Sequence, residues 1–528
     1  MTSNFPTTVT RRLASLLALA AIFAVLGGCG GGGGGSSPAV AVAPEPEPEP
    51  EQWQPGVFEP ASNFKDMCAS PRIGAQFPDT QGTTTDENNW LRSWSNDLYL
   101  WYEEIEDRDP ARYTTPDYFD LLKTFASTPT GAPKDRFHFT YPTQEWEALS
   151  QSGQQPGYGA AFVLLAAAPP RELAVAYIEP ASPAEAAGLV RGARVLEIDG
   201  VSVVNGSDVD TLNAGLYPSA AGEEHVFVVQ EPGGGSRTVT LTSAIVTEDP
   251  VQFVKVIDSL TGPVGYLHFT RHIATAEREL IDAIEFLGNA GVTDLILDVR
   301  YNGGGFLDIA NELAFMIAGG GAASGRVFAE IQFNDKHQTV NPVTGAVLEP
   351  EYFHTTTQGF SAEAGDPLPT LNLDRLYVLT TADTCSASES IVNGLRGIDL
   401  DVVQVGSPTC GKPYGFYATD NCGTTYFSIQ FKAVNAKGFG DYPDGFAPED
   451  GAPAGAVTLP GCGVDDDFDN PLGDPAEALL ATALEHRAGL GCPVGTATAA
   501  RAEPRLAGKG SGGEPLAPPR PYGMVLVR

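Results

Sequence analysis

The sequence is poor in basic residues. Its 528 residues include 31 lysines and arginines against 66 aspartates and glutamates, which gives a formal net charge of −35. Because phosphate backbones are bound by clustered lysine and arginine side chains, this deficit argues against a broad nucleic-acid surface, and we expect no nucleic-acid partner. A chain of this length is also too long for one core, so we expect about two to four domains.

A complete phosphate-binding loop is absent as well. The stretch GSPTCGKPYG, residues 406–415, nearly matches the nucleotide loop G-x-x-x-x-G-K-[ST]. That loop needs a hydroxyl directly after its lysine to ligate Mg²⁺, whereas Lys412 is followed by Pro413, which has neither a hydroxyl nor an N–H. Nucleotide binding is therefore rejected, and Lys412 needs another role.

Metal-binding patterns are also incomplete. The cysteine spacings fit no zinc motif. Asp465, Asp467 and Asp469 are spaced as in a calcium loop, but Asn470 replaces its glycine and no glutamate stands at its twelfth position. We expect this segment to be a solvated turn, and we expect no metal and no cofactor.

No apolar run near the N-terminus is long enough for a comfortable membrane span. Arg11 and Arg12 precede the run LASLLALAAIFAVL, which small residues follow, as in a secretory signal. The segment Leu26-Gly27-Gly28-Cys29 resembles the lipobox of bacterial lipoproteins. The resemblance implies a signal peptide at 1–28, membrane attachment through an acylated Cys29 and, because Gly30 follows, an outer-membrane location facing the periplasm. The alternative is a plain signal peptide with an incidental cysteine.

Six further cysteines suggest disulfides. An even number in an exported protein is typical of a disulfide framework, although about 15 pairings are possible. They are Cys68, Cys385, Cys410, Cys422, Cys462 and Cys492.

Composition divides the rest of the chain. Residues 29–60 are rich in Gly, Pro and Glu and predict a tether. Residues 61–153 are predicted to be helical, and within them Leu91, Trp94, Leu98 and Trp101 recur at spacings of three and four. We interpret this stripe as core packing.

Residues 154–247 change to short β-type runs with one short helix. This region resembles a PDZ domain. The matching segments are the loop Gly157-Tyr158-Gly159-Ala160, Ser182-Pro183-Ala184 at a helix start, and a turn with Gly192, Ile198, Asp199 and Gly200. The resemblance implies that Gly157, Tyr158, Gly159 and Ala160 bind the carboxylate of a peptide added as a strand. The alternative is a small β domain that only orders the structure.

Residues 248–495 alternate strand and helix patterns. VGYLHF, DLILDV, RLYVLT and DVVQV read as strands, with helical faces between them. Such βαβ units predict an α/β core, so the whole chain is expected to be a mixed α/β multidomain protein. The Gly- and Pro-rich residues 496–528 are expected to form a flexible tail.

Three loops leave the carboxyl ends of these strands, where ligands gather in parallel sheets. They carry the stretches 300–305, 382–389 and 406–412. A serine at a helix start is commonly only an N-cap, a triple glycine only a turn, and a lysine only a surface group. None of the three is specific alone.

Together these stretches resemble the C-terminal processing peptidases, which use a Ser/Lys dyad. The family pattern D-[LV]-R-x-N-x-G-G, S-x-S-x-S-E and G-x-x-T-x-G-K matches residues 298–305, 384–389 and 406–412. The resemblance implies that Ser386 is the nucleophile, that Lys412 is a base kept neutral by burial, and that Ala387 and Gly303 or Gly304 provide oxyanion N–H groups. It also implies polypeptide substrates with apolar C-termini.

Two departures from the family pattern are notable. Thr384 replaces the first serine of the motif, and Phe416 replaces a glutamine that orients the lysine in relatives. Cys385, directly before the nucleophile, suggests a disulfide with Cys410 that would clamp the two catalytic loops.

Two alternatives stay open. His268 and His272, at the end of an early core strand, could serve Ser386 in a Ser/His/Asp triad, although such histidines are more often structural. The chain could also be a catalytically weak or inactive peptide-binding lipoprotein of the same fold, for which Phe416 is the best support.

Overall fold

The computed structural model describes residues 53–259 and 261–493 and the two short strands 505–506 and 523–525. The predicted signal peptide, Cys29 and most of the predicted tether lie outside the described residues. Within the described part of the chain, no helix is both long and apolar enough to cross a membrane.

The first region combines helices with a few short strands. Thr83 caps α1 through Asp86 N–H, and the Asp86 side chain accepts from Thr83 N–H in return, which closes a capping box. Helix α1 ends at Leu98, so Trp101 lies outside the predicted stripe and packs against Tyr414 instead. The elements are η1 (Ala61–Asn63), β1 (Met67–Cys68), β2 (Thr80–Gln81), α1 (Thr84–Leu98), η2 (Tyr102–Glu104), η3 (Pro110–Arg112), α2 (Thr115–Leu121), β3 (Phe139–Pro142) and α3 (Thr143–Ser152).

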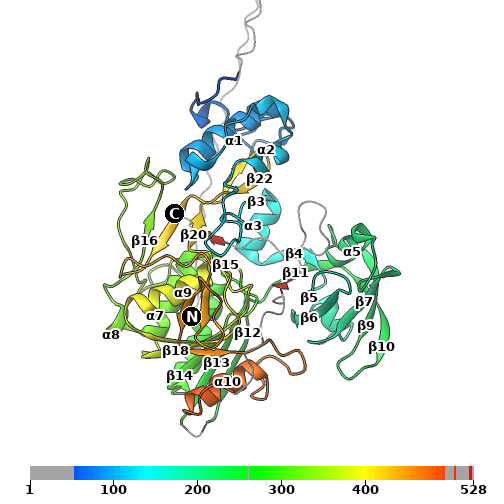
Figure 1. The fold of residues 1–528 in the computed structure, drawn as a ribbon, viewed down its shortest axis with the longest axis vertical. Helices are drawn as coiled ribbons and strands as arrows, with labels where there is room; N and C mark the ends of the chain where they lie inside the picture. Colours follow the sequence, from blue (N-terminus) through cyan, green and yellow to red (C-terminus); the bar gives the residue numbers. More distant parts are fainter. Residues whose placement is uncertain (1–52, 260, 494–504, 507–522, 526–528) are drawn as a thin grey trace, which may run out of the picture. The chain divides into compact units, whose positions relative to one another are not determined.

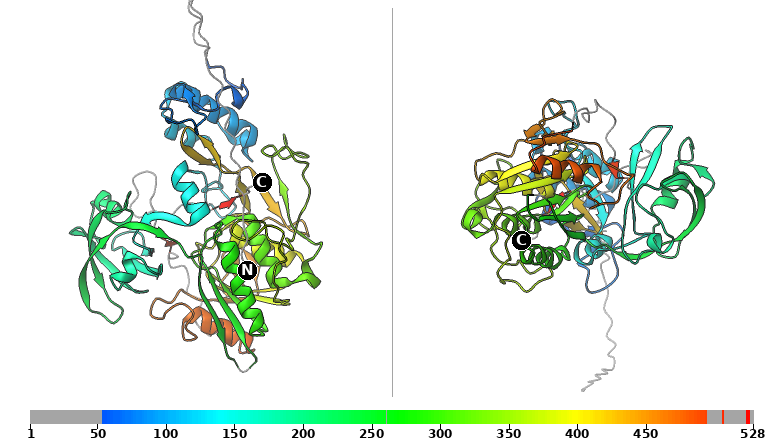
Figure 2. Two further views of the ribbon diagram at one scale, coloured as in Figure 1. Left: turned by 180° about the vertical axis from the view of Figure 1, so that it is seen from behind. Right: turned by 90° about the horizontal axis from the view of Figure 1, so that it is seen from below.

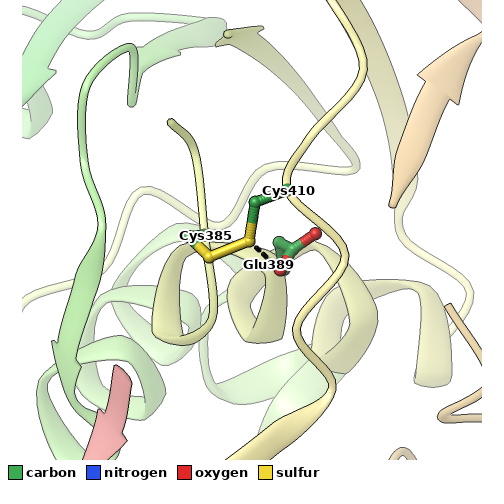
Figure 3. Close-up of side chains that lie close together, drawn as sticks. All are labelled: Cys385, Glu389 and Cys410. Carbon is green, nitrogen blue, oxygen red and sulfur yellow. Dashed lines mark hydrogen bonds between the residues drawn. A yellow bond between two sulfur atoms is a disulfide. The ribbon is translucent and has the colours of Figure 1, made fainter. Parts of the chain in front are cut away.

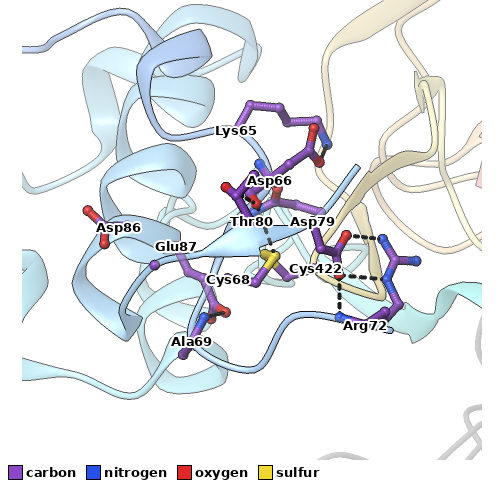
Figure 4. Close-up of a disulfide and its surroundings, with 12 residues drawn as sticks. Lys65, Asp66, Cys68, Ala69, Arg72, Asp79, Thr80, Asp86, Glu87 and Cys422 are labelled. Carbon is purple, nitrogen blue, oxygen red and sulfur yellow. Dashed lines mark hydrogen bonds and ion pairs between the residues drawn. A yellow bond between two sulfur atoms is a disulfide. The ribbon is translucent and has the colours of Figure 1, made fainter. Parts of the chain in front are cut away.

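A disulfide ties this region to the core. Cys68 bonds to Cys422, which follows a hairpin strand (Figure 4). Beside it, Asp66 N–H donates to Asn421 Oδ1 at 2.9 Å. Arg72 and Asp79 form a bidentate ion pair beside it. The cross-link joins residues 354 positions apart in the sequence, so it closes a long loop and constrains the unfolded chain.

The second region forms a β-sheet with two short helices. The strands run in the order β10-β9-β7-β6-β5, and the flanking strands β4 and β11 pair with each other outside it (Figure 1). Its elements are β4 (Gln154–Gly157), β5 (Ala160–Ala166), β6 (Glu172–Ile178), α4 (Pro183–Ala186), β7 (Arg194–Ile198), β8 (Val201–Ser202), α5 (Val209–Leu216), β9 (Glu224–Gln230), β10 (Ser236–Thr242) and β11 (Ala244–Thr247).

The α/β core is built on a six-stranded sheet, β12-β13-β14-β18-β19-β26. Strand β12 is antiparallel to β13, and all the other neighbours are parallel. The strands are β12 (Val251–Ile257), β13 (Val264–Phe269), β14 (Asp294–Asp298), β18 (Arg375–Thr380), β19 (Asp401–Gly406) and β26 (Gly461–Gly463). The predicted mixed α/β architecture with βαβ units is confirmed.

Helices cover both faces of this sheet (Figures 1 and 2). Side chains alternate along each strand, so Leu295 and Leu297 pack with α6, α7 and α9, whereas Ile296 packs with α10. This alternation explains why the strands are apolar at every position: both faces are buried. The helices are α6 (Ala276–Asn289), α7 (Leu307–Ala318), α8 (Gly320–Ala323), α9 (Ala387–Gly397) and α10 (Ala478–Arg487).

A second sheet, β15-β28-β20-β23-β16-β17, contains a strand from the segment predicted to be a flexible tail. Two strands of that segment are described, β27 (Arg505–Leu506) and β28 (Gly523–Val525). The remaining strands of the core are β15 (Gly304–Phe306), β16 (Val327–Gln332), β17 (Glu351–Tyr352), β20 (Tyr414–Phe416), β21 (Thr419–Asn421), β22 (Thr424–Phe427), β23 (Phe431–Val434), β24 (Phe446–Pro448) and β25 (Val457–Leu459).

Candidate active site

Three neighbouring strands bring the predicted loops together. Strands β14, β18 and β19 are adjacent and parallel, so their carboxyl ends share one edge of the sheet. Cys385 N–H donates to Asn302 O at 3.0 Å, and Cys410 N–H donates to Thr384 O at 3.0 Å. The serine loop is therefore hydrogen-bonded both to the glycine loop and to the lysine loop.

Ser386 has a strained backbone at the start of α9. Its φ of 61° and ψ of −109° lie in a region that a non-glycine residue rarely adopts, at a cost of about 1–3 kcal/mol. Ser386 is fully buried, and its Oγ has no hydrogen-bond partner among the described residues. A strained turn that presents a hydroxyl at a helix N-terminus is a setting in which a serine nucleophile can be held.

The glycine strand β15 lies directly against this serine. A Cβ atom on Gly304 would stand 3.0 Å from both Ser386 Cβ and Ala387 N, so only glycine permits this approach. Gly304 N–H, however, donates to Asn302 Oδ1 at 3.0 Å. This N–H is already engaged, so among the predicted oxyanion donors the geometry favours Gly303 and Ala387 over Gly304.

Asn302 positions the glycine loop. Its Nδ2 donates to Phe269 O at 3.0 Å, and its backbone O accepts from Ser388 Oγ at 3.1 Å. Asn302 thus links strand β13, the glycine loop and the helix that carries Ser386.

Lys412 is fully buried, and burial lowers its pKa well below the usual 10.5, because a buried ammonium loses its hydration. The nearby carboxylates of Asp135 and Glu389 act in the opposite direction but more weakly. Its Nζ lies 4.8 Å from the ring centroid of Phe137 and 4.2 Å from that of Phe416. These rings help to exclude water from Nζ, and it is this loss of hydration that favours the neutral amine.

Glu389 joins the serine and lysine loops. Its buried carboxylate accepts from the N–H groups of Ser386, Gly411 and Lys412, each at 2.8 Å, and from Thr409 Oγ1 at 2.5 Å. Burial raises the pKa of Glu389, and these hydrogen bonds act against that rise. One side chain therefore fixes the backbone of both proposed catalytic residues.

A disulfide reinforces this link. Cys385 and Cys410 are bonded, as the sequence suggested, with a Cα–Cα distance of 5.1 Å (Figure 3). Cys410 Sγ lies 3.5 Å from Glu389 Oε2. In the described chain these three residues form the one group with metal-ligand spacing, but both sulfurs are consumed by the disulfide, so the group is a poor metal site.

The N-terminal region contributes to the lysine's surroundings. Asp135 accepts from Tyr99 O–H at 2.7 Å and from Phe137 N–H at 3.0 Å, and Arg136 donates to Cys410 O. Sequence reasoning missed Asp135 and Phe137. No local motif marks them, because they lie 277 and 275 positions before Lys412 and meet it only in the folded chain.

The two histidines are poor candidates for a base. Burial lowers the pKa of His268 to about 4 and that of His272 to about 3. His272 Nδ1 is paired with Asn302 Oδ1 at 3.1 Å, and His268 is stacked on Phe253. A base of such low pKa accepts a proton weakly at neutral pH. His272 instead helps to line a small pocket, together with Gly304 and Phe416.

A buried ion-pair network braces the residues before the glycine loop. Arg300 donates to Asp298 Oδ2 at 2.6 Å, and to Asp466 and Glu477, both at 2.8 Å. Arg191, from the second region, donates to Asp466 at 2.7 Å and to Tyr301 Oη at 2.9 Å. The β region is therefore bonded directly to the residue that precedes Asn302.

The predicted peptide-binding loop connects β4 to β5. Gly159 has a φ of 71°, and a Cβ there would lie 2.3 Å from Ser182 Cβ. The Tyr158 side chain is buried and its hydroxyl donates to Gly215 O at 2.9 Å, so it supports α5 rather than facing a ligand. The backbone of this loop and the adjacent edge of β5 remain the predicted binding surface.

Comparison with known proteins agrees with this architecture. Residues 263–416 match peptidase family S41, and residues 175–239 match the PDZ domain. A carboxyl-terminal-processing protease of Picosynechococcus sp. is 33% identical over 145 residues, which is 26% of this chain and 32% of that protein. The chloroplastic C-terminal processing peptidase of Tetradesmus obliquus is 29% identical over 244 residues, 44% of this chain and 46% of the relative. The matched stretches thus span a third to about half of these relatives.

A solved structure has the same fold. A putative S41 protease from Bacteroides fragilis aligns with a TM-score of 0.53 and 23% identity, over 79% of this chain and 100% of the other. The chain thus contains a region that matches peptidase family S41, preceded by a region that matches the PDZ domain, and it is similar in part to carboxyl-terminal-processing proteases.

Proposed function

We propose that the protein is a serine-type endopeptidase that uses Ser386 as nucleophile and Lys412 as general base. The observation that carries this proposal is the complete burial of Lys412 with a lowered pKa, beside a loop that holds Ser386 in a strained conformation with an unengaged hydroxyl. A lysine can act as a base only when it is neutral, and an inactive relative has no need for this costly arrangement.

The reaction then follows from the geometry. Ser386 Oγ attacks the peptide carbonyl carbon while its proton moves to Lys412 Nζ. The N–H groups of Ala387 and Gly303 stabilise the negative oxygen. Lys412 returns the proton to the departing amine, leaving an acyl-enzyme at Ser386, and the neutral lysine then activates the water that hydrolyses the ester. No metal or cofactor is required for this sequence of steps.

The substrates would be polypeptides with apolar C-termini. The PDZ loop Gly157–Ala160 and the edge of β5 would hold the end of such a polypeptide as an added strand. The N-terminal pattern supports lipid attachment at Cys29, at an outer membrane facing the periplasm. Labelling of the wild type but not of Cys29→Ser by an alkyne-palmitate analogue tests this anchoring.

Cleavage of an unfolded protein with an apolar C-terminus tests the activity. The wild type is compared with Ser386→Ala and Lys412→Ala, with Lys437→Ala as a control, because Lys437 is solvent-exposed and pairs with Asp399 away from the site. We expect both site variants to lose activity by at least about a thousand-fold and the control to retain it. An inert wild type that still binds the C-terminus would support the peptide-binding lipoprotein instead.

A further inference from the structure

A strand of the chain itself lies beside the proposed nucleophile. Strand β28 (Gly523–Val525) is inserted between β15 and β20 and runs parallel to both (Figures 1 and 2). Met524 is opposite Gly305 on one side and Gly415 on the other. Because β28 is paired on both sides, it occupies the slot between these strands.

This slot borders both proposed catalytic residues. On one side, Gly523 pairs with Gly304, the residue that lies against Ser386 and Ala387. On the other side, β20 begins two residues after Lys412. Strand β28 also lies close to α9, which starts at Ala387. An extended peptide in this slot therefore passes directly by the site of the proposed reaction.

The same segment reaches the PDZ edge. Strand β27 (Arg505–Leu506) pairs antiparallel with Leu164 and Val163 of β5. Strand β5 follows the predicted carboxylate-binding loop, and addition of an antiparallel strand to such an edge is how PDZ domains take peptides. β27 and β28 thus occupy the two places that a substrate polypeptide would need.

We propose that strands β27 and β28 act as intramolecular ligands that occupy both peptide sites, β27 at the PDZ edge and β28 between β15 and β20. This inference rests on the proposed function, because it takes the site beside Ser386 to be the peptidase site. It adds that a substrate binds there as an extended strand between β15 and β20, parallel to both. A substrate must first displace the chain's own strand.

Tethering makes this competition strong. A linked segment has an effective concentration of about 1 mM. If the segment binds its site with an intrinsic dissociation constant of about 10 µM, a free peptide competing for that site appears about a hundred-fold weaker. Loss of β28 should therefore raise the apparent affinity for a free peptide by at least about ten-fold.

The test uses the full chain carrying Ser386→Ala, which keeps the segment intact and makes the readout independent of catalysis. Met524→Pro is compared with Met524→Val in this background. Proline removes a backbone N–H from a strand that is paired on both sides, whereas valine is compatible with a strand. Binding of the fluorescent peptide PYGMVLVR, the sequence of residues 521–528, is measured by anisotropy, and hydrogen exchange is measured in β15 and β20.

We expect Met524→Pro to bind the peptide at least about ten-fold more tightly and to exchange faster in β15 and β20, with Met524→Val unchanged. Unchanged affinity and exchange in Met524→Pro would overturn the inference. Leu506→Pro provides a second test, which does not disturb the core. Amide hydrogen exchange at Val163 and Leu164 should become faster, and an unchanged rate there would also count against the inference. An inert wild type with the expected binding changes would instead contradict only the proposed catalysis.

Discussion

The centroid of the Phe416 ring lies 4.2 Å from Lys412 Nζ, at the position where the family resemblance implies a glutamine. An aromatic face attracts an ammonium ion but offers nothing to a neutral amine beyond packing. Phe416 therefore acts on the charge of the lysine, opposing the effect of burial, and does not replace the amide as a hydrogen-bonding partner.

Phe416→Leu should shift the pH dependence of peptidase activity. Without the ring the ammonium is less stable, so the pKa of Lys412 falls further, and the acid limb of kcat/KM moves to lower pH by about 0.4–1.5 units. The measurement is a pH–rate profile of Phe416→Leu beside Phe427→Leu. Phe427 packs in the same aromatic cluster, against Phe139 and Phe416, and serves as the matched control. If the acid limb of kcat/KM in Phe416→Leu stays in place, or moves to higher pH, the Phe416 ring does not stabilise the Lys412 ammonium.

Lys412→Met should stabilise the protein. The folded-state pKa of Lys412 lies below its unfolded value of 10.5, so between these values the unfolded chain binds one more proton and the free energy of unfolding rises with pH. At neutral pH the wild type therefore lacks stability that methionine restores, by about 1–4 kcal/mol. Urea unfolding from about pH 7 to about pH 10 should show this gain shrinking as pH rises.

Lys437→Met is the control for this effect. Lys437 is exposed, and its replacement should change stability by no more than about 0.5 kcal/mol at any pH. An equal pH dependence in the wild type and Lys412→Met would mean that the buried lysine is not the source of the slope.

The sequence predicted the site through motifs that each lie within one loop. Ser386, Lys412 and the glycine stretch follow three strands, and parallel pairing brings their ends together without knowledge of the rest of the fold. Asp135 and Phe137 could not be found in this way, because they come from another region and carry no periodic or motif signal. The hydrogen bond that engages Gly304 N–H depends on a side-chain rotamer of Asn302, which spacing does not determine.

The tail illustrates a different limit. Residues 496–528 have a composition typical of a flexible segment, yet two short strands within them pair with β5, β15 and β20. Strand pairing uses backbone groups and needs few apolar side chains, so composition alone does not predict it.

Loss of the Cys385–Cys410 disulfide should reduce both stability and activity. The cross-link spans 25 residues and should contribute about 3–4 kcal/mol through loop closure. Because it also joins the serine loop to the lysine loop, the double variant Cys385→Ala/Cys410→Ala should lose at least about ten-fold in kcat.

The Cys462–Cys492 disulfide is a close control, since it spans 30 residues and lies on α10's side of the sheet. The variant Cys462→Ala/Cys492→Ala should lose a similar amount of stability, measured as a urea midpoint, while its kcat at a temperature where it is folded stays near the wild-type value. Equal losses of kcat in both double variants would mean that the first disulfide acts only through global stability.

Arg191→Met should slow catalysis, although Arg191 belongs to the PDZ region and not to the peptidase core. Arg191 holds Tyr301 Oη at 2.9 Å and Asp466 at 2.7 Å, and Tyr301 directly precedes Asn302, whose side chain holds the glycine loop. Displacing this loop misplaces the oxyanion donors, so kcat/KM and the rate of labelling by a serine-directed acylating probe should fall by about 10- to 100-fold.

Arg237→Met is the matched control for Arg191→Met. Arg237 bonds to Glu231 and to Ala187 O at 3.0 Å, within the PDZ region, and its loss should lower that region's stability without slowing the probe. If both variants label at the wild-type rate, the contact between Arg191 and Tyr301 only supports the fold. A rate that falls in Arg191→Met alone, with peptide binding at the PDZ edge intact, would support a role of the PDZ region in setting the geometry of the glycine loop, because Arg191 bonds to Tyr301 and Asp466 beside that loop and Arg237 does not.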